Sequence, residues 1–297
     1  MRGTKRAIGL AVAITALGAA TAGHAAFPGS NGRVFFDASG GGNGRVIASV
    51  KPEGSDRTRV AEGIEPAVSP NGSEIAYARR GDLYLAARGG TDEIQITNTP
   101  EVERTPSFSP SGNRLVFATE RHQGEDGHIF SMRTDGGDRT RLTQSEQADF
   151  SPSYSPSGNK IVFTRELRDA TEQLFKMDAD GTHIEQLTFA RTLSQTPSWS
   201  PDGNRIAFQR FDQGDSFIYS IEPDGSDLLQ LTSDPGARDF EPAYSPSGNK
   251  IVYRGQVSEE DESKALFVIP ASGGAREQLT EARQGGVDAD PYWGTTP

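Results

Sequence analysis

Charged side chains at fixed repeat positions are the residues of this sequence best suited to ligand chemistry. Acids stand three positions before one recurring proline, and arginines stand eight or nine positions after a second recurring proline. Carboxylates and guanidinium groups that lie close together either form ion pairs with one another or bind polar ligands such as a peptide segment or a sugar. The acids are Glu103, Asp149, Asp239 and Asp288, and the arginines are Arg79, Arg165, Arg210 and Arg254.

Three further carboxylates, Glu65, Glu241 and Asp290, stand immediately before the first of these prolines. If that proline lies in the first strand of a repeated unit, all the acids gather where the first strand begins and the arginines gather where the second strand ends. Antiparallel strands bring those two ends to one face. Two interpretations follow: the charges bridge the incoming loop of a unit to its second strand, or they line the mouth of a channel and bind a polar ligand.

The elements that must position these charges come from a repeat. The phrase Ser-Pro-x-Gly begins at residues 69, 109, 155, 200 and 245, so successive copies are 40, 46, 45 and 45 residues apart. This spacing is typical of a four-stranded propeller blade and is too long for ankyrin or leucine-rich repeats. In the phrase, proline presets the first central residue of a hairpin turn and glycine takes the positive φ that the turn requires.

One unit, residues 196–232, parses into four short strands with apolar residues at every second position, which favours strand over helix. Aromatic residues recur in register on the first two strands, and we expect them to fill the space between neighbouring blades rather than to stack on a ligand. On the first strand they are Phe108, Tyr154, Trp199 and Tyr244, and on the second they are Tyr77, Phe117, Phe163, Phe208 and Tyr253.

The two ends of the chain predict how the ring closes. Strand ends of the type Leu/Ile-Thr mark five complete blades, and residues 32–60 supply three strands of a sixth blade without its first strand. Residues 290–294 copy the start of a unit and then stop. We therefore expect an all-β, six-bladed β-propeller of four-stranded blades, closed by a C-terminal strand at about 290–294 that pairs with the N-terminal blade. Closure removes the exposed sheet edges of an open array.

The first 25 residues predict a signal peptide, because Arg2, Lys5 and Arg6 precede an uncharged, Ala-rich run and Ala25 suits a signal peptidase. A retained membrane anchor is the alternative. With signal cleavage, residues 26–297 form one domain without disulfides, exported to the periplasm or beyond and not inserted in a membrane. The net charge of −11 and a pI near 4.9 argue against a nucleic-acid partner.

The repeated phrase Pro-x-aromatic-Ser-Pro-x-Gly-x-x-Ile-x-Phe, followed by Asp-Gly-Gly/Ser and Leu-Thr, resembles the TolB-type, WD-like propeller repeat. The resemblance covers nearly the whole chain after the leader. It implies a propeller like that of TolB, a periplasmic protein-binding component of a cell-envelope complex, but without the α/β domain that precedes the propeller there. Prolyl-oligopeptidase-like enzymes also carry such propellers beside an α/β-hydrolase domain, for which we expect this chain to have no room.

Catalytic and metal-binding patterns are weak. Gly-x-Ser-x-Gly is absent, so a hydrolase nucleophile has no motif. His122 and His128 share a loop, and we expect that loop to be solvated rather than to bind zinc. Residues 178–183 resemble the start of a calcium loop, as do residues 222–227, but both segments also read as hairpin turns. We therefore expect no metal and no cofactor.

Together these patterns predict an exported, monomeric binding or scaffold protein that recognises a protein, peptide or glycan through the charged face where the variable loops lie. We expect no catalysis. The alternative is an extracellular or cell-wall enzyme, a polysaccharide lyase or hydrolase, that uses acids and arginines of the same face. A scaffold that only spaces an envelope assembly is a third possibility.

Overall fold

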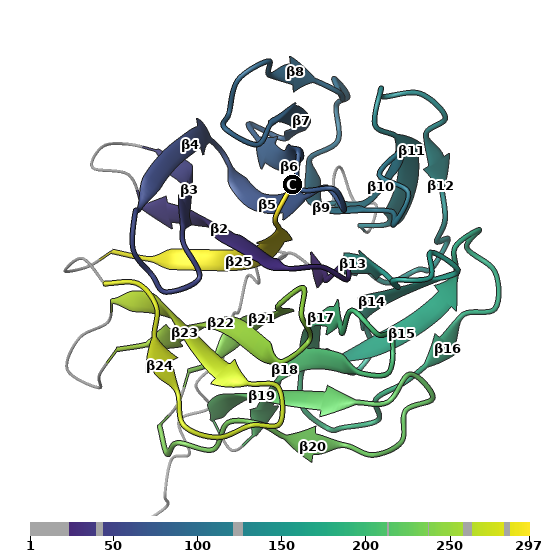
Figure 1. The fold of residues 1–297 in the computed structure, drawn as a ribbon. Helices are drawn as coiled ribbons and strands as arrows, with labels where there is room; N and C mark the ends of the chain where they lie inside the picture. The colour runs from purple at the N-terminus through teal and green to yellow at the C-terminus, as the bar shows by residue number, and fades with distance from the viewer. Residues whose placement is uncertain are drawn as a thin grey trace, which may run out of the picture.

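The fold is a ring of six antiparallel sheets, each of which is one blade (Figure 1). The computed structural model describes residues 24–39, 44–120, 127–212, 214–236, 238–257, 263–281 and 286–297. Within them all regular structure is strand, as the sequence predicts. The all-β, six-bladed expectation is confirmed.

Each blade consists of four strands that follow one another from the centre of the ring outward. Blade 1 comprises β25 (Asp288–Thr295), β2 (Asn31–Ser39), β3 (Arg45–Val50) and β4 (Thr58–Glu62). Blade 2 comprises β5 (Ile64–Val68), β6 (Glu74–Arg79), β7 (Asp82–Ala87) and β8 (Ile94–Gln95). Blade 3 comprises β9 (Glu103–Phe108), β10 (Arg114–Thr119), β11 (Ile129–Arg133) and β12 (Thr140–Arg141).

The second half of the ring repeats this order. Blade 4 comprises β13 (Asp149–Tyr154), β14 (Lys160–Glu166), β15 (Glu172–Asp178) and β16 (Glu185–Gln186). Blade 5 comprises β17 (Ser194–Trp199), β18 (Ile206–Asp212), β19 (Asp215–Ile221) and β20 (Leu229–Gln230). Blade 6 comprises β21 (Phe240–Tyr244), β22 (Lys250–Gln256), β23 (Lys264–Pro270) and β24 (Glu277–Gln278). First strands of neighbouring blades contact one another, so they surround the centre.

The two ends of the chain close the ring within blade 1. β25 pairs antiparallel with β2, with Trp293 opposite Val34 and Tyr292 opposite Phe35. The indole Nε1 of Trp293 donates to the carbonyl of Gly32 at 3.1 Å. The C-terminal strand is therefore the missing first strand of the N-terminal blade, as the sequence predicts.

The Ser-Pro-x-Gly hairpins owe their shape to both the serine and the glycine. In blade 5, the Oγ of Ser200 accepts the amide of Arg205 at 2.9 Å and donates to Asp202 at 2.6 Å. Gly203 has φ of 73° and donates its amide to the carbonyl of Ser200 at 2.9 Å. The side chain thus satisfies a strand amide that the turn leaves unpaired, which explains why serine precedes proline in each copy.

The recurring Leu/Ile-Thr pair has a similar local cause. The Oγ1 of Thr232, just past β20, accepts the amide of Ile218 in β19 at 3.0 Å. The fourth strand is only two residues long, so this hydroxyl extends its pairing with the third strand. The same bond recurs in blades 2, 3, 4 and 6, from Thr97, Thr143, Thr188 and Thr280.

Aromatic residues pack within each blade and between neighbouring blades. Phe163 on β14 and Phe175 on β15 stack at 5.9 Å between ring centroids, and equivalent pairs stack in blades 2, 3, 5 and 6. The first-strand aromatics Phe108, Tyr154, Trp199 and Tyr244 are at most 3% exposed. Their expected place in the core is confirmed.

A β-bulge near the start of each first strand places the backbone of one residue in the left-handed region, with positive φ. That residue always stands immediately before the strand proline, and in each blade the pairing of first and second strands shifts register beside it. Six non-glycine side chains thereby occupy equivalent places near the centre of the ring: Glu65, Thr105, Ser151, Thr196, Glu241 and Asp290, with φ of 47° to 56°.

The N-terminal segment lies at the centre of the ring. β1 (His24–Ala25) pairs in parallel with β17 and also contacts β9, β13 and β21, which are first strands of three other blades. In Figure 1 this dark purple segment lies inside the ring, beside β13. Ala26 and Phe27 that follow it are buried, so this described segment helps to fill the centre of the ring.

Candidate functional site

The first strand begins and the second strand ends on one side of the ring, which we call the loop face; the Ser-Pro-x-Gly turns lie on the opposite side, the turn face. On the loop face of blade 4, Arg165 meets Asp149 across the strand pair β13 and β14. Its Nε donates to Oδ1 at 2.6 Å and its Nη2 donates to Oδ2 at 2.9 Å. Asp149 is fully buried and also accepts the Oγ of Ser145 at 2.9 Å. The predicted bridge between incoming loop and second strand thus forms in this blade.

In blades 1, 3 and 6 the predicted acid pairs with an arginine that stands just before the fourth strand. Asp288 receives two hydrogen bonds from Arg57, at 2.7 and 2.8 Å. Glu103 lies 3.3 Å from Arg139 and accepts Thr97 at 2.9 Å. In blade 6, Asp239 lies 4.0 Å from Arg276, and burial raises the pKa of Asp239 to about 6.

Two predicted arginines pair with other carboxylates than the acids three positions before the proline. Arg79 of blade 2 donates to both oxygens of Glu93, at 2.6 and 2.8 Å, because Gly63 occupies the acid position of that blade. Arg254 binds Glu241, the residue before the proline, at 2.7 and 2.9 Å. Register explains the second case, since Arg254 stands one residue earlier than the other arginines.

A common unit emerges from these contacts, which we call the arginine unit: an arginine lies over the aromatic rings of its own blade and, in five of the six blades, faces a carboxylate. The arginine comes from the second strand in blades 2, 4 and 5 and from the residue just before the fourth strand in blades 1, 3 and 6. Cation–π contacts of this kind hold the guanidinium plane in place. The six are Arg57 on Phe36, Arg79 on Tyr84, Arg139 on Phe130, Arg165 on Phe175, Arg210 on Tyr219 and Arg276 on Phe267, at 3.9 to 5.4 Å.

Blade 5 differs from the other five blades. Arg210 stacks 5.4 Å above Tyr219, yet it forms no ion pair with any described residue, and the acid position holds Ser194. Of the eight residues that the sequence singles out, the structure therefore places seven beside an opposite charge and leaves Arg210 without a carboxylate in the described part of the chain.

Carboxylates also gather deeper in the ring, near blades 6, 1 and 2. Glu65 accepts the amide of Thr105 at 2.8 Å, and burial raises the pKa of Glu65 to about 8 although Arg104 lies 3.9 Å away. Burial also raises the pKa of Asp37, which pairs with Arg45 and neighbours Asp290. The pKa of Asp290 is raised well above its ordinary value by burial, with neighbouring carboxylates adding to the effect. Burial thus opposes ionisation of all three carboxyl groups.

Sequence reasoning missed Arg57, Glu93, Arg139 and Arg276, which complete most of the arginine units. A signal was present: Glu93, Arg139 and Arg276 each stand four residues before the threonine of a Leu/Ile-Thr pair. It also missed Asp37, Arg45 and Arg104, for which no repeat position gives a signal.

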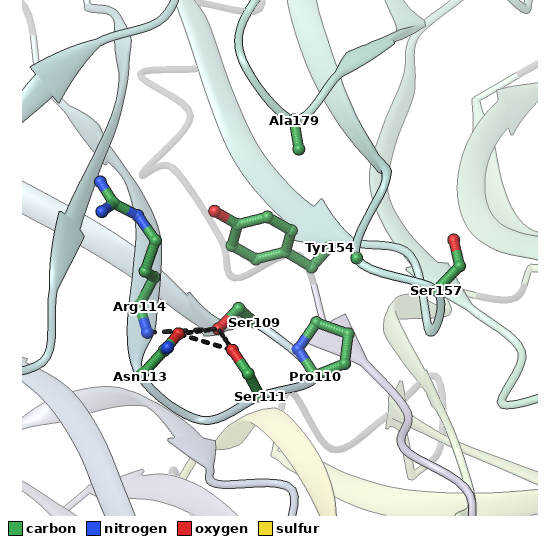
Figure 2. A pocket seen from close by; sticks show the side chains of 9 residues that line it. Ser109, Pro110, Ser111, Asn113, Arg114, Tyr154, Ser157 and Ala179 are labelled. Atoms are coloured by element: carbon green, nitrogen blue, oxygen red, sulfur yellow. Dashed lines mark hydrogen bonds between the residues drawn. The ribbon is translucent and has the colours of Figure 1, made fainter.

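A pocket of about 280 Å³ lies on the turn face between blades 3 and 4 (Figure 2). Its floor is the ring of Tyr154, and its rim is formed by the Ser-Pro-Ser-Gly turns at 109 and 155. Arg114 reaches its edge but donates to Ser131 at 3.1 Å and to the carbonyl of Asp138 at 3.2 Å. The serine and asparagine side chains of its rim bond to one another within each turn, so they are not free to bind a ligand.

The histidines occupy ordinary structural environments where they are described. His128 is buried and its Nε2 lies 2.6 Å from the Nη2 of Arg141, while His183 lies 2.6 Å from Asp178. His122 lies outside the described residues. In the part of the chain that is described, no group of three or more His, Asp or Glu side chains is arranged to hold a metal ion. Nor does that part contain a helix with the length and apolarity needed to cross a bilayer.

The fold and the arginine units define a six-bladed β-propeller. Each blade carries an arginine stacked on its aromatic rings at the loop face, and in five of the six blades this arginine pairs with a carboxylate. The sequence pattern of the TolB beta propeller domain matches residues 57–296. The chain belongs to this family. None of the curated proteins compared with it matches.

Solved structures show the same fold at low identity. TolB from Acinetobacter baumannii is 21% identical, with a TM-score of 0.76 over 89% of this chain and 67% of that one. The putative TolB from Agrobacterium tumefaciens is 20% identical, with a TM-score of 0.69 over 85% of this chain and 91% of that one. An oligogalacturonate lyase in complex with manganese is 19% identical, with a TM-score of 0.59 over 80% and 71%. These likenesses establish the fold, which hosts both binding proteins and enzymes.

Proposed function

We propose that this chain is an exported, non-catalytic binding protein that recognises a protein, peptide or glycan through its loop face. The observation that supports this most is a group of three arginines at the loop end of blade 5. Arg191 and Arg238 are exposed and Arg210 is half-buried, and none forms an ion pair with a described residue. On a protein with a net charge of −11, such a local group of cations favours an acidic partner.

Membership of the TolB propeller family supports the binding role, and the N-terminal leader predicted from the sequence supports export. The predicted signal peptide, residues 1–25, lies almost entirely outside the described residues. We propose a mature monomer, residues 26–297, that acts in the periplasm or outside the cell.

The test is capture of a partner from the envelope and culture fluid of the producing cell. Arg210→Glu is the informative variant, because no carboxylate of a described residue pairs with Arg210 and reversal should leave the blade folded. Lys250→Glu is the matched control: Lys250 is exposed on the turn face in no described ion pair, and its reversal changes the net charge equally. A partner kept by the wild type and the control but lost with Arg210→Glu supports the proposal. Equal capture by all three contradicts a loop-face site.

The second candidate, a polysaccharide lyase or hydrolase, is favoured by the structural likeness to oligogalacturonate lyase. It predicts turnover of an acidic polysaccharide that vanishes when a single acid such as Asp239 is replaced. Turnover by the mature domain, lost with Asp239→Asn while the melting temperature holds, would replace the binding proposal with an enzymatic one.

A further inference from the structure

The arginine units provide an internal comparison that singles out blade 5. In five blades the guanidinium faces a carboxylate, which comes from the first strand in blades 1, 3 and 4, from the residue just before the first strand in blade 6 and from just before the fourth strand in blade 2. In blade 5 these two positions hold Ser194 and Leu228. The arginine, the aromatic ring and the strand geometry are kept, and only the acid is replaced.

Blade 4 shows how the same place is filled by an aspartate. Asp149 pairs with Arg165 across the strands just as Ser194 pairs with Arg210. Both guanidinium groups lie over the aromatic ring of the third strand, at 4.9 Å in blade 4 and 5.4 Å in blade 5. Since the two arginines are held alike, the carboxylate position seen in blade 4 has a direct counterpart beside Arg210.

Polar groups of Arg210, of Ser194 opposite it and of Thr192, two residues earlier in the chain, lack hydrogen-bond partners among the described residues. The Nε of Arg210, the Oγ of Ser194 and the Oγ1 of Thr192 are all buried and all without a partner. Ser194 is fully buried, whereas Arg210 and Thr192 are half-buried, with their exposed area on other atoms. Buried donors without partners are unfavourable, and a carboxylate can accept from all three.

We propose that the loop end of blade 5 binds the carboxylate of an aspartate or glutamate side chain from a peptide ligand. The carboxylate accepts the Nε and Nη hydrogens of Arg210 and the hydroxyls of Ser194 and Thr192. An acidic peptide is the favoured source because blade 4 fills the same place with an aspartate of an extended strand. The inference rests on the proposed binding function and names the chemistry that it recognises.

Other charges near the site are compatible with this assignment. Asp212 follows Arg210 by two residues on β18 and so faces the same side, but it forms no ion pair with Arg210. Exposed Arg191 and Arg238 add positive charge at the same end of the blade. Asp212→Asn should therefore keep or strengthen binding, whereas removal of the Arg210 guanidinium should abolish it.

The experiment is an NMR titration of the mature domain with N-acetyl-aspartate N-methylamide, and with the asparagine analogue as the neutral control. We expect saturable shifts of the Arg210 Nε–H resonance with the aspartate probe and none with the asparagine probe, because only the former carries a charge for a bidentate contact. Equal shifts with both probes would overturn the proposal. So would binding of galacturonate without binding of the aspartate probe, which would assign the site to a glycan.

Two variants supply the missing carboxylate from within the protein. Ser194→Asp copies the acid position of blade 4, and Leu228→Glu copies the position of Glu93 in blade 2 from a half-exposed surface site, so it avoids disturbing the core. Each substitution should lower the affinity for the aspartate probe by about tenfold or more, as expected when an internal carboxylate competes for a charge-assisted pair. Each should also raise the melting temperature by about 2 °C. Unchanged probe binding in folded Leu228→Glu would overturn the proposal.

The outcomes separate this inference from the proposed function. If a loop-face partner is captured but the aspartate probe does not bind at Arg210, the inference fails and the binding function stands. If the probe binds and no partner is captured, the carboxylate site stands and the proposed cellular role fails.

Discussion

At the residue scale, the loop-face charges stabilise the fold from within. Asp149 is fully buried and the side chain of Arg165 is only 14% exposed, so their bidentate pair is largely shielded from water. Removing one partner of a buried pair leaves the other charge without compensation, which is far more destabilising than losing an exposed pair. Such pairs explain why the acids and arginines recur at fixed repeat positions whether or not a ligand uses them.

We expect Asp149→Asn to lower the free energy of unfolding by about 2–4 kcal/mol, because Arg165 would lose its buried counter-charge. Glu146→Gln is the control: Glu146 and Arg168 form an ion pair at 2.8 Å with both side chains more than 80% exposed, so its loss should change stability by less than about 0.5 kcal/mol. Urea denaturation of both variants checks this. Similar small losses in both would show that the blade 4 pair is not shielded.

Glu65 makes stability depend on pH. Its pKa is about 8 in the fold because of burial, opposed by Arg104 and reinforced by Asp37 and Glu120, and about 4.5 in the unfolded chain. Folding therefore favours the protonated form. The stabilising contribution is fully present below about pH 4.5 and is lost as the pH rises through about 8.

Glu65→Gln should flatten the fall in unfolding free energy between about pH 5 and about pH 9, since glutamine keeps an acceptor for the amide of Thr105 and cannot ionise. Urea midpoints measured across this range test the expectation. Glu277→Gln, at an exposed position on β24, serves as the control and should follow the wild type. A Glu65→Gln profile as steep as that of the wild type would show that other groups cause the pH dependence.

At the element scale, the end of the predicted leader and the residues that follow it act as part of the core. Residues 24–25 pair with β17 inside the ring, and Phe27 is 4% exposed within the apolar cluster of blades 1, 2 and 3. A short extended segment that fills the centre of a ring gains stability from burial on several sides. The sequence marks this segment only as the end of a leader.

Phe27→Ala should lower the free energy of unfolding by about 3 kcal/mol, because it removes a buried aromatic ring and leaves a cavity. Phe189→Ala is the matched control: Phe189 is 78% exposed, so the change should stay within about 0.5 kcal/mol. Chemical denaturation of residues 26–297 carrying each change measures the difference. Equal stability of the two variants would exclude a packing role for the N-terminal segment.

At the scale of the whole molecule, closure of the ring is the decisive feature. β25 pairs with β2 along most of its length and all eight of its residues are buried. Without it, β2 would still pair with β3 but would have an unpaired edge at the centre of the ring, and neighbouring blades would lose their contacts with Tyr292 and Trp293. An exposed strand edge of this kind also promotes aggregation.

Deletion of residues 288–297 should sharply lower the melting temperature or cause aggregation. Deletion of Thr296 and Pro297 alone should leave the melting temperature nearly unchanged, because both residues are exposed and lie beyond β25. Differential scanning calorimetry with light scattering distinguishes the outcomes. Unchanged melting after the longer deletion would mean that the ring does not need its closing strand.

Most of the fold could be predicted from the sequence, because its determinants are local. The Ser-Pro-x-Gly hairpins, the period-two apolar pattern and the Leu/Ile-Thr strand ends act over a few residues, and their 40- to 46-residue spacing identifies blades. The terminal fragments add up to one further blade, so even the closing strand was predictable. The sequence also placed Asp149 and Arg165 at positions that could bridge.

Only the tertiary structure decided which charges pair. Arg79 pairs with Glu93 and Arg139 pairs with Glu103, because strand register and stacking on the aromatic rings of the blade set the distances between arginine and carboxylate. Sequence spacing alone does not encode these distances. The same holds for the burial of Glu65, for the N-terminal segment inside the ring and for Arg210, whose lack of a carboxylate among the described residues becomes evident when the six blades are compared in space. Local patterns determine the blade, whereas contacts between distant segments determine where charge is left available for a ligand.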